Sequence, residues 1–566
     1  MAERKSPPAS RRAFLAATGL SLPAMAAGRP VLAASQRAAP GEAIRATLTA
    51  DAGEILHPLP KTQYGHFIEH LGHCIKGGIW AEGERLDLFL GGVRPELVEA
   101  IRSIHPALIR YPGGCFADGY HWKDGIGPRA GRPLRPNLAW GKLGPQAGPP
   151  ENNHFGTDEF LQLCAAVGAE PMLTVNVGSG TAAEAADWVE YANGSSLTRW
   201  GGERKRNGHP APYGVKDWFI GNEIFGFYEI GHLTPEQYVK VFREYARAMR
   251  AVDPSIKLIA VGNHFSRSKP SKMDINRQVL EGTAGEIDYL SVHQYVHTPR
   301  LTLEDFLRFQ FVWAERNRSA RFYYEILATA EEYRSFLDQT IATVRQSSPA
   351  GNPVPIAFDE WNLWYHSYQD IVQANYNLRD GLWCATVLNL LHQRAPDIPI
   401  ANLAQMVNCL GLITSEPGGT FLTPSAWVFK LYAENAGTHL ARFQVESPAV
   451  PHPSQMPAVD ASVTVSEDRV ALFLVNRHLE APVELTGRLA GIRVEPEVQE
   501  QVLTHANPVQ YNTLRQPEAV KPRSRMIQPV TGQSQNGLTL SVLLPPHSLT
   551  CLGLKRIAYT KLHSKI

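Results

Sequence analysis

Closely spaced cysteine pairs are missing from this sequence. The 566-residue chain has six cysteines, which are Cys74, Cys115, Cys164, Cys384, Cys409 and Cys551. None belongs to a C-x-x-C pair, and their spacing fits neither a zinc site nor a disulfide framework. We therefore expect mostly free, buried thiols.

An excess of charge of either sign is also missing. The 55 basic and 54 acidic residues give a net charge of +1, which offers no electrostatic footprint for nucleic acid or an anionic membrane. No apolar run is long enough to span a bilayer as a helix of the mature protein. The hydrophobic content of 44% and the charged content of 19% are typical of a soluble globular protein. The length allows a large catalytic domain with a smaller one.

The N-terminus has the composition of a targeting segment. Paired Arg11 and Arg12 precede Ala13-Phe14-Leu15 and a mildly apolar stretch that reaches about residue 27. This pattern resembles a twin-arginine export signal; the alternative is a disordered basic tail. We predict that residues 1–35 are a signal and that the mature protein is periplasmic or secreted by the twin-arginine route. Substrates of this route fold before export in a reducing compartment, in agreement with free thiols.

Eight strand-like runs alternate with helical stretches between about residues 60 and 430. They are largely continuous apolar runs, as expected for strands buried on both faces, and helical patterns such as Asp158–Val167 and Pro235–Val252 lie between them. The runs are Tyr64–Glu69, Ala107–Tyr111, Pro171–Val177, Asp217–Glu223, Ile256–Val261, Tyr289–Tyr295, Pro355–Glu360 and Ala401–Val407. The alternation predicts an α/β fold in which residues 57–435 form a (β/α)8 TIM barrel.

Beyond about residue 440 the pattern changes to strands. A proline-rich segment, 447–457, comes before strand-length runs at 462–466, 470–475 and 538–544, without clear helices. We predict an all-β, jelly-roll-like sandwich. Ile44–Leu48 also has a strand pattern, so we assign residues 44–56 together with 436–557 to this domain.

Two glutamates stand where apolar runs stop. Glu223 ends Asp217–Glu223, and Glu360 ends Pro355–Glu360. The strand ends of a parallel barrel meet on one face, which holds the chemistry, and a pair of carboxylates is what glycoside hydrolysis needs. The alternative is that both are structural carboxylates bound to loop amides or arginines. Asn222 before the first glutamate, and Trp361-Asn362 after the second, favour catalysis.

Two motifs suggest other chemistry. His66-Phe-Ile-Glu69-His70 matches the zinc-protease pattern H-x-x-E-H, which would need both histidines on one face of a helix. It occupies the first strand position of the barrel instead. The loop 177–183 resembles a dinucleotide-binding turn, but one such loop in mid-chain is weak support without a suitable ribose-binding acid. We therefore predict neither a metal nor an organic cofactor.

With these residues placed, the chain resembles the family 51 glycoside hydrolases, the α-L-arabinofuranosidases. The matching segments follow the family's order: Tyr64–His70, Arg110–Pro128, Phe155–Phe160, Gly221–Glu223, Ser291–Tyr295, Phe358–His366 and Leu403–Asn408. The family's fold is a (β/α)8 barrel with a C-terminal β-sandwich, which agrees with the patterns above.

The resemblance implies roles for the residues around the two carboxylates. Glu223 matches the family's general acid/base, and Glu360 matches its nucleophile. Arg110 would anchor the network around the nucleophile and hold it ionised. His293 and Tyr295 would lie beside the two carboxylates.

The resemblance also implies the sugar contacts. Asn222 would bond the 2-hydroxyl, Glu69 and Gln405 would bond other hydroxyls, and Trp140 would be an apolar wall. Cys115, also expected at the substrate, stands where many members have asparagine. The segment 224–229 is more aromatic than the family's usual pattern, which bears on the leaving-group side.

The function implied is that of a retaining, exo-acting α-L-arabinofuranosidase. It would release terminal α-L-arabinofuranosyl residues from arabinan, arabinoxylan or arabino-oligosaccharides by double displacement. The alternatives are a glycosidase of the same barrel type, such as a β-xylosidase or endoglucanase, a carbohydrate-binding protein that has lost catalysis, and, more distantly, a zinc hydrolase. Homo-oligomers are common in the family, so a homo-oligomer stays open.

Overall fold

The computed structural model describes residues 43–263, 270–283, 285–297, 319–349, 351–364 and 376–557. The predicted export signal, residues 1–35, lies outside these residues. In the part of the chain that the model describes, no helix is long and apolar enough to cross a membrane.

A closed barrel of eight parallel strands forms the first half of the fold. The strands are β2 (Gly65–Phe67), β3 (Leu108–Tyr111), β4 (Glu170–Val175), β5 (Asp217–Ile220), β6 (Lys257–Val261), β7 (Tyr289–His297), β8 (Ile356–Trp364) and β9 (Ile400–Ala404). All eight predicted strands are confirmed, and each pairs in parallel with its neighbours round the ring.

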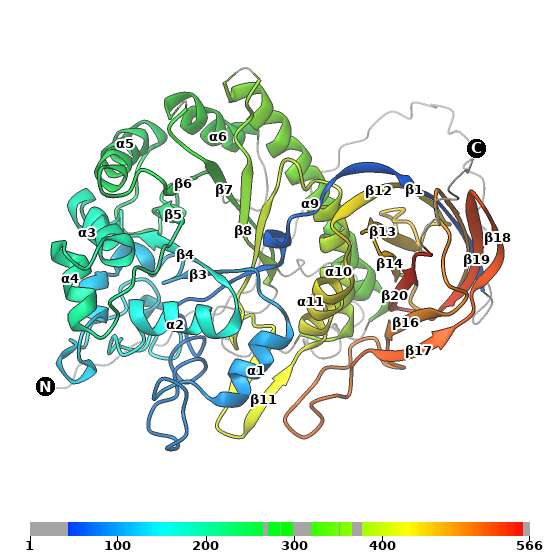
Figure 1. Cartoon of the computed structure of the whole chain (residues 1–566), viewed down its shortest axis with the longest axis horizontal. Coiled ribbons are helices and arrows are strands. Elements are labelled where there is room, and N and C mark those ends of the chain that lie inside the picture. Colours follow the sequence, from blue (N-terminus) through cyan, green and yellow to red (C-terminus); the bar gives the residue numbers. More distant parts are fainter. Residues whose placement is uncertain are drawn as a thin grey trace, which may run out of the picture. The chain divides into compact units, whose positions relative to one another are not determined.

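Helices cover the outside of the barrel strands (Figure 1). They are α1 (Pro95–Ser103), α2 (Thr157–Val167), α3 (Ala182–Asn193), α4 (Arg199–Arg206), α5 (Pro235–Val252), α6 (Pro270–Gly282), α9 (Ala320–Ser347), α10 (Leu378–His392) and α11 (Pro424–Asn435). The start of α5 shows why the sequence located it: the side chain of Thr234 accepts the N–H of Gln237, and proline opens the first turn. The buried face of α5 recurs every three or four residues, at Tyr238, Phe242, Tyr245 and Met249.

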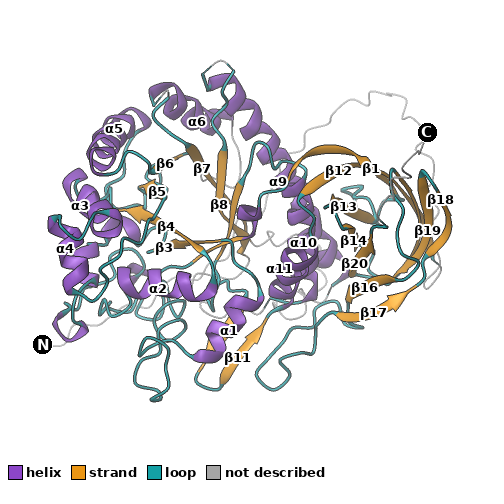
Figure 2. Cartoon of the chain, in the orientation of Figure 1, coloured by secondary structure: helices purple, strands orange, loops and turns teal. Residues whose placement is uncertain are grey.

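A second, ten-stranded sheet follows the barrel (Figure 2). Its strands are β1 (Ile44–Pro58), β12 (His439–Glu446), β13 (Val459–Val465), β14 (Arg469–Asn476), β15 (Val483–Ala490), β16 (Val498–Leu503), β17 (Arg523–Ile527), β18 (Val530–Ser534), β19 (Gly537–Leu544) and β20 (Ser548–Lys555). Their order is β17-β16-β20-β14-β13-β12-β1-β15-β19-β18. All pairs are antiparallel except β1 with β15. The sheet encloses its own apolar core, which includes Leu48, Val463, Leu472, Leu485 and Leu540.

The N-terminal strand belongs to this C-terminal sheet. β1 pairs with β12 on one side and with β15 on the other, as the strand pattern of Ile44–Leu48 predicts. A small hairpin, β10 (Ile413–Glu416) with β11 (Gly419–Leu422), stands outside both sheets. The domain limits at residues 56 and 436 stay predictions.

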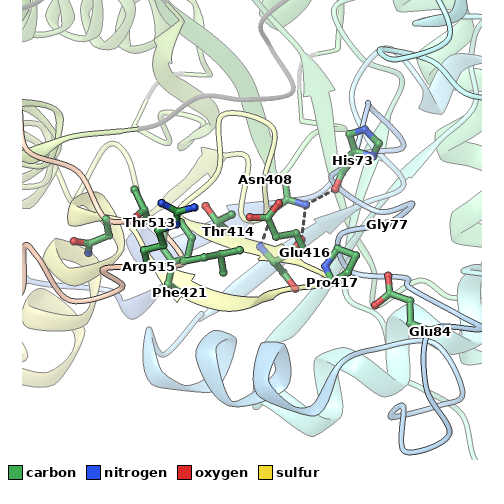
Figure 3. A pocket seen from close by; sticks show the side chains of 13 residues that line it. His73, Gly77, Glu84, Asn408, Thr414, Glu416, Pro417, Phe421, Thr513 and Arg515 are labelled. Atoms are coloured by element: carbon green, nitrogen blue, oxygen red, sulfur yellow. Dashed lines mark hydrogen bonds between the residues drawn. The ribbon is translucent and has the colours of Figure 1, made fainter.

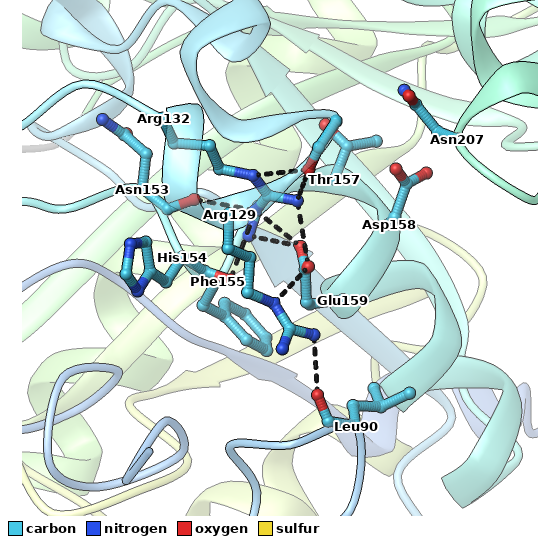
Figure 4. Close-up of polar contacts among 12 residues, drawn as sticks. Leu90, Arg129, Arg132, Asn153, His154, Phe155, Thr157, Asp158, Glu159 and Asn207 are labelled. Carbon is cyan, nitrogen blue, oxygen red and sulfur yellow. Dashed lines mark hydrogen bonds and ion pairs between the residues drawn. The ribbon is translucent and has the colours of Figure 1, made fainter. Parts of the chain in front are cut away.

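Ion pairs anchor the long loop between β3 and α2 (Figure 4). Both Arg129 and Arg132 bond the carboxylate of Glu159, at 3.1 and 3.0 Å, and the same carboxylate accepts the N–H of Gly156 at 3.0 Å. Since Glu159 lies in the first turn of α2, the helix fixes the base of the loop that carries Trp140.

The cysteines agree with the prediction. All six are free, and five are buried; Cys115 is the partly exposed one.

Candidate active site

The first glutamate stands on a tightly turned backbone at the end of β5. Gly221 has φ +82° and Glu223 has φ +37°, a conformation that costs a non-glycine residue energy and is found mostly where function requires it. The turn directs Glu223, which is 8% exposed, into the barrel mouth. One carboxylate oxygen of Glu223 and one of Glu360 lie within 4.8 Å of each other and of a ring nitrogen of His293.

A bulge in β8 brings two consecutive carboxylates to the same side. Between the pairs Ser291–Ala357 and His293–Glu360, β7 advances by two residues and β8 by three. Consecutive side chains of a regular strand point to opposite faces, and a bulge changes this. As a result Nη1 of Arg110 reaches both Asp359 Oδ2, at 2.9 Å, and Glu360 Oε1, at 2.7 Å.

Arg110, on β3, is the hub of the site and is fully buried. Besides the two carboxylates, its Nη2 donates to Asn222 Oδ1 at 2.8 Å and its Nε donates to Thr174 Oγ1 at 3.1 Å. The guanidinium lies over the ring of Phe219, 4.3 Å from the centroid. This planar fork fixes groups from β4, from β8 and from the turn after β5 relative to one another.

His293 lies between the two glutamates. Its Nδ1 is 2.8 Å from Glu223 Oε1 and its Nε2 is 3.2 Å from Asp359 Oδ2. Burial acts to lower the pKa of His293, but Glu360 and Asp359 outweigh it and raise the pKa to about 10. The imidazole is therefore a cation at neutral pH, with both nitrogens donating. Tyr295, two residues further along β7, donates its hydroxyl to Glu360 Oε2 at 2.9 Å.

Opposing influences act on Glu360. Burial raises its pKa, the charges of His293 and Arg110 lower it, and those of Glu223 and Asp359 raise it again, so the pKa lies above its usual value. The Arg110 charge acts in the expected direction, and the expectation that it holds this carboxylate ionised stays a prediction.

Glu69, just after β2, joins the loops that follow β3 and β9. Its Oε1 accepts the N–H groups of Gly114 and Phe116 at 3.1 and 3.0 Å, and its Oε2 accepts Gln405 Nε2 at 3.1 Å. Burial, and then the charge of Glu360, raise the pKa of Glu69 to about 7. In the described part of the chain, Gln405 Oε1 is buried without a hydrogen-bond partner, an arrangement that suits a group awaiting a polar ligand. The Trp140 side chain faces Glu69 and acts to lower the pKa of that carboxyl group.

Asn222 is held from two sides. Arg110 fixes its Oδ1, and its Nδ2 lies 3.3 Å from Glu229 Oε1. The same Glu229 oxygen accepts the thiol of Cys115 at 2.8 Å. Burial and the neighbouring Asp118 raise the pKa of Glu229 well above its usual range, and burial with the Glu229 charge raises that of the Cys115 thiol. Both shifts favour the protonated forms, which suits a hydrogen-bonded support of Asn222.

The two competing motifs serve the fold. His66 lies on β2 rather than on a helix, with its ring 4.8 Å from that of Phe429, and burial lowers its pKa to about 3. Nδ1 of His70 is hydrogen-bonded to Oε2 of Glu151, at 2.7 Å. The loop after β4 donates the N–H groups of Val177 and Gly178 to Asp118 Oδ1, at 2.9 and 3.2 Å. The zinc-protease and dinucleotide interpretations are therefore wrong for these segments.

Metal ligation at the two glutamates would have to displace existing partners. Two groups of side chains have ligand atoms within 4.8 Å of one another, Cys115 with Glu223 and Glu229, and Glu223 with His293 and Glu360. Each of these side chains already takes part in the hydrogen bonds described above. The atoms that could bind a metal ion are thus already engaged in hydrogen bonds.

A cavity of about 770 Å³ lies elsewhere on the molecule (Figure 3). It is lined by residues that follow β2 and β9, by the β10–β11 hairpin and by residues 512–515. In Figure 3, Asn408 points toward the backbone of His73, whose carbonyl it bonds at 2.8 Å. None of the carboxylates around Arg110 lines this cavity, so the chemistry belongs to the barrel mouth.

All ten residues predicted for the site lie in this one cluster. The sequence analysis missed Asp359, Asp118, Tyr228 and Glu229, which contact members of the cluster. Asp359 had a signal, since it precedes Glu360, but the alternation of a regular strand would turn it away. Asp118 lies within the segment Arg110–Pro128, whereas Tyr228 and Glu229 lie in the unusually aromatic segment.

Comparisons with known proteins agree with one another. The model of the α-L-arabinofuranosidase 1 domain matches residues 100–311, and that of the α-L-arabinofuranosidase C-terminal domain matches residues 359–548. The chain is 31% identical to the intracellular exo-α-(1→5)-L-arabinofuranosidase 1 of Bacillus subtilis, over 88% of this chain and 96% of that one. It is 33% identical to the α-L-arabinofuranosidase C of Emericella nidulans, over 74% of this chain and 82% of that one.

Solved structures are equally similar. The arabinose complex of the Thermotoga maritima α-L-arabinofuranosidase shares 33% identity and a TM-score of 0.77, and the match covers 90% of this chain and 100% of that one. The GH51 α-L-arabinofuranosidase of Thermotoga petrophila shares 32% identity and a TM-score of 0.77, with 90% and 99% covered.

Proposed function

We propose a function on the premise that this chain belongs to the family 51 glycoside hydrolases, the α-L-arabinofuranosidases. The enzyme releases terminal α-L-arabinofuranosyl residues with retention of configuration. One observation carries the proposal: the Glu223 and Glu360 oxygens lie within 4.8 Å of each other. Carboxyl groups about 5–5.5 Å apart are typical of retaining enzymes, whereas about 6.5–9.5 Å leaves room for the water of an inverting one.

In the first step, Glu360 attacks the anomeric carbon of the sugar. Tyr295 and Arg110 each bond one oxygen of Glu360, at 2.9 and 2.7 Å, and so orient the carboxylate. As the C–O bond to Glu360 forms, the bond to the leaving oxygen breaks. Glu223 gives that oxygen its proton and becomes a carboxylate.

In the second step, Glu223 acts as a base. It takes a proton from water while the water oxygen attacks the anomeric carbon and the bond to Glu360 breaks. His293, a cation bonded to Glu223 Oε1, favours the ionised form that this step needs. Each turnover restores both carboxyl groups and requires no cofactor.

The sugar contacts are proposed from polar groups around the two glutamates. Asn222 would bond the 2-hydroxyl, and Glu69 with Gln405 would bond other hydroxyls. The buried, unpartnered Gln405 Oε1 supports this, because a polar group left without a partner selects a ligand that supplies one. Cys115 would act indirectly, since its thiol is directed to Glu229.

Early-time proton NMR of the released arabinose tests the mechanism. An aryl α-L-arabinofuranoside is hydrolysed, and the anomers are followed before mutarotation equilibrates them. The α anomer should appear first. If the β anomer appears first, Glu360 acts as a base for water rather than as a nucleophile, and the proposal fails.

We also propose that residues 1–35 direct export by the twin-arginine route, on the strength of Arg11-Arg12 and the weakly apolar stretch after them. The arabinan, arabinoxylan or oligosaccharide substrate would then be met outside the cytoplasm. Replacing both arginines by lysine should retain the activity in the cytoplasm. Unchanged periplasmic activity of the double variant would contradict the assignment.

A further inference from the structure

The loop after β5 folds back on the residues that open it. The N–H of Gly226 donates to the Glu223 carbonyl at 2.7 Å, and that of Glu229 donates to the Gly226 carbonyl at 3.0 Å. These two turns return Tyr228 to the side chain of Glu223. Its hydroxyl donates to Glu223 Oε2 at 2.5 Å, a short distance typical of an O–H bonded to a carboxylate.

The two oxygens of Glu223 have different tasks. Oε1 faces the charged His293, whose Nδ1–H occupies it at 2.8 Å. The proton that passes to the leaving group must therefore travel on Oε2, the oxygen that Tyr228 contacts. The Tyr228 ring is only partly covered, with 44% of the residue exposed, so the hydroxyl can withdraw without unpacking the core.

We propose that Tyr228 is a positioning residue for the acid/base Glu223. Its hydroxyl holds Oε2 in the free enzyme and yields this place to the leaving oxygen, and later to the attacking water. The inference rests on the proposed role of Glu223. Tyr228 neither gains nor loses a proton over the cycle: the proton passes from Glu223 Oε2 to the leaving oxygen in the first step and from water to Oε2 in the second.

The hydrogen bond has a measurable consequence. A donor that binds the ionised form of a carboxyl group lowers its pKa. Among the described residues, the titratable groups that face Glu223 include His293 on β7, Glu360 on β8, and Cys115 and Glu229 on the loops after β3 and β5, with Tyr295 further along β7. All of them are kept when the Tyr228 hydroxyl alone is removed.

Tyr228→Phe is the test, read as the pH profile of kcat/KM. With an arabinofuranosyl-xylo-oligosaccharide, whose leaving group needs the acid, the alkaline limb should move up by about one pH unit, because Glu223 would stay protonated to higher pH. With dinitrophenyl arabinofuranoside, which needs little acid catalysis, the same variant should keep the wild-type profile.

Tyr213→Phe is the matched control. Its hydroxyl also donates to a carboxylate, Asp158 Oδ1 at 2.7 Å, away from the site. This variant should leave both profiles unchanged. If Tyr228→Phe also leaves the alkaline limb unmoved while Glu223→Gln is inactive, the inference about Tyr228 is overturned. If Glu223→Gln remains active on the xylo-linked substrate, the proposed role of Glu223 itself fails.

Discussion

Replacement of Arg110 by lysine should cripple the enzyme although the positive charge is kept. A lysine ammonium is a compact donor on a flexible stem and lacks the planar fork. It can stay near Asp359 and Glu360, but it cannot also reach Asn222 and Thr174, which the arginine bonds at 2.8 and 3.1 Å. Asn222 would then lose the contact that fixes its Oδ1.

The size of the effect follows from the bonds lost. A hydrogen bond to a charged group is worth about 1.5–3 kcal/mol, so the two lost bonds amount to roughly 3–4 kcal/mol at the low end of that range. At about 1.4 kcal/mol per factor of ten, kcat/KM for an aryl arabinofuranoside should fall about 10²–10³-fold. Arg110→Met, which also removes the charge, should in addition move the acid limb of kcat/KM to higher pH, because Arg110 opposes the raised pKa of Glu360.

Arg204→Lys is the control for losing a buried guanidinium. Arg204, on α4, is fully buried too, but it donates to the carbonyls of Tyr191 on α3 and of Gly194 and His209 in the loops after α3 and α4. This variant should lower the melting temperature and leave kcat/KM within about threefold of wild type. A loss below tenfold in folded Arg110→Lys, or an equal loss in Arg204→Lys, would refute the reasoning.

Three further predictions concern the carboxyl groups. Glu360→Ala should abolish turnover without unfolding the protein, and azide should restore part of it; near-wild-type activity would exclude Glu360 as the nucleophile. Glu223→Ala should slow pre-steady-state glycosylation by a xylo-linked substrate about 10²–10⁴-fold and glycosylation by dinitrophenyl arabinofuranoside much less, so equal losses would contradict the acid role. Glu69→Gln concerns stability. Burial raises the pKa of Glu69 from 4.5 to about 7, so the contribution of Glu69 to the free energy of unfolding is fully present below pH 4.5 and is lost as the pH rises through 7. The melting temperature of wild type should therefore fall more steeply between pH 5 and 7 than that of the variant, and parallel curves would count against the shift.

The sequence located the barrel because each of its strands leaves a local signal. A strand buried on both faces must be apolar throughout, and helices with caps separate the strands, so periodicity alone locates β2 to β9 and α5. The order of the second sheet leaves no such signal. Alternation places strands but not their neighbours, and the parallel pairing of β1 with β15 joins residues more than 400 positions apart.

The site was predictable where a residue sits at a strand end or in a family segment. Asp359 was not, because a one-residue bulge in β8 decides which way it points. Tyr228 and Glu229 were not, because two turns of the loop after β5 bring them back to Glu223 and Asn222. The burial that raises the pKa of Glu360 against the charge of Arg110 was also beyond the sequence, because it appears only in three dimensions.

Because β1 lies inside the C-terminal sheet, it can pair only after the strands on either side of it have been synthesised. β1 leaves the ribosome first, yet β12 begins at His439, about 380 residues after β1 ends at Pro58. At about 5–20 residues per second, the strand waits roughly 20–75 s with its backbone unpaired, while the barrel is completed behind it. An unpaired strand invites association with other chains. When many chains are made at once, folding should therefore fail at this step. Slower translation, or a chaperone that binds extended segments, should raise the yield of folded protein.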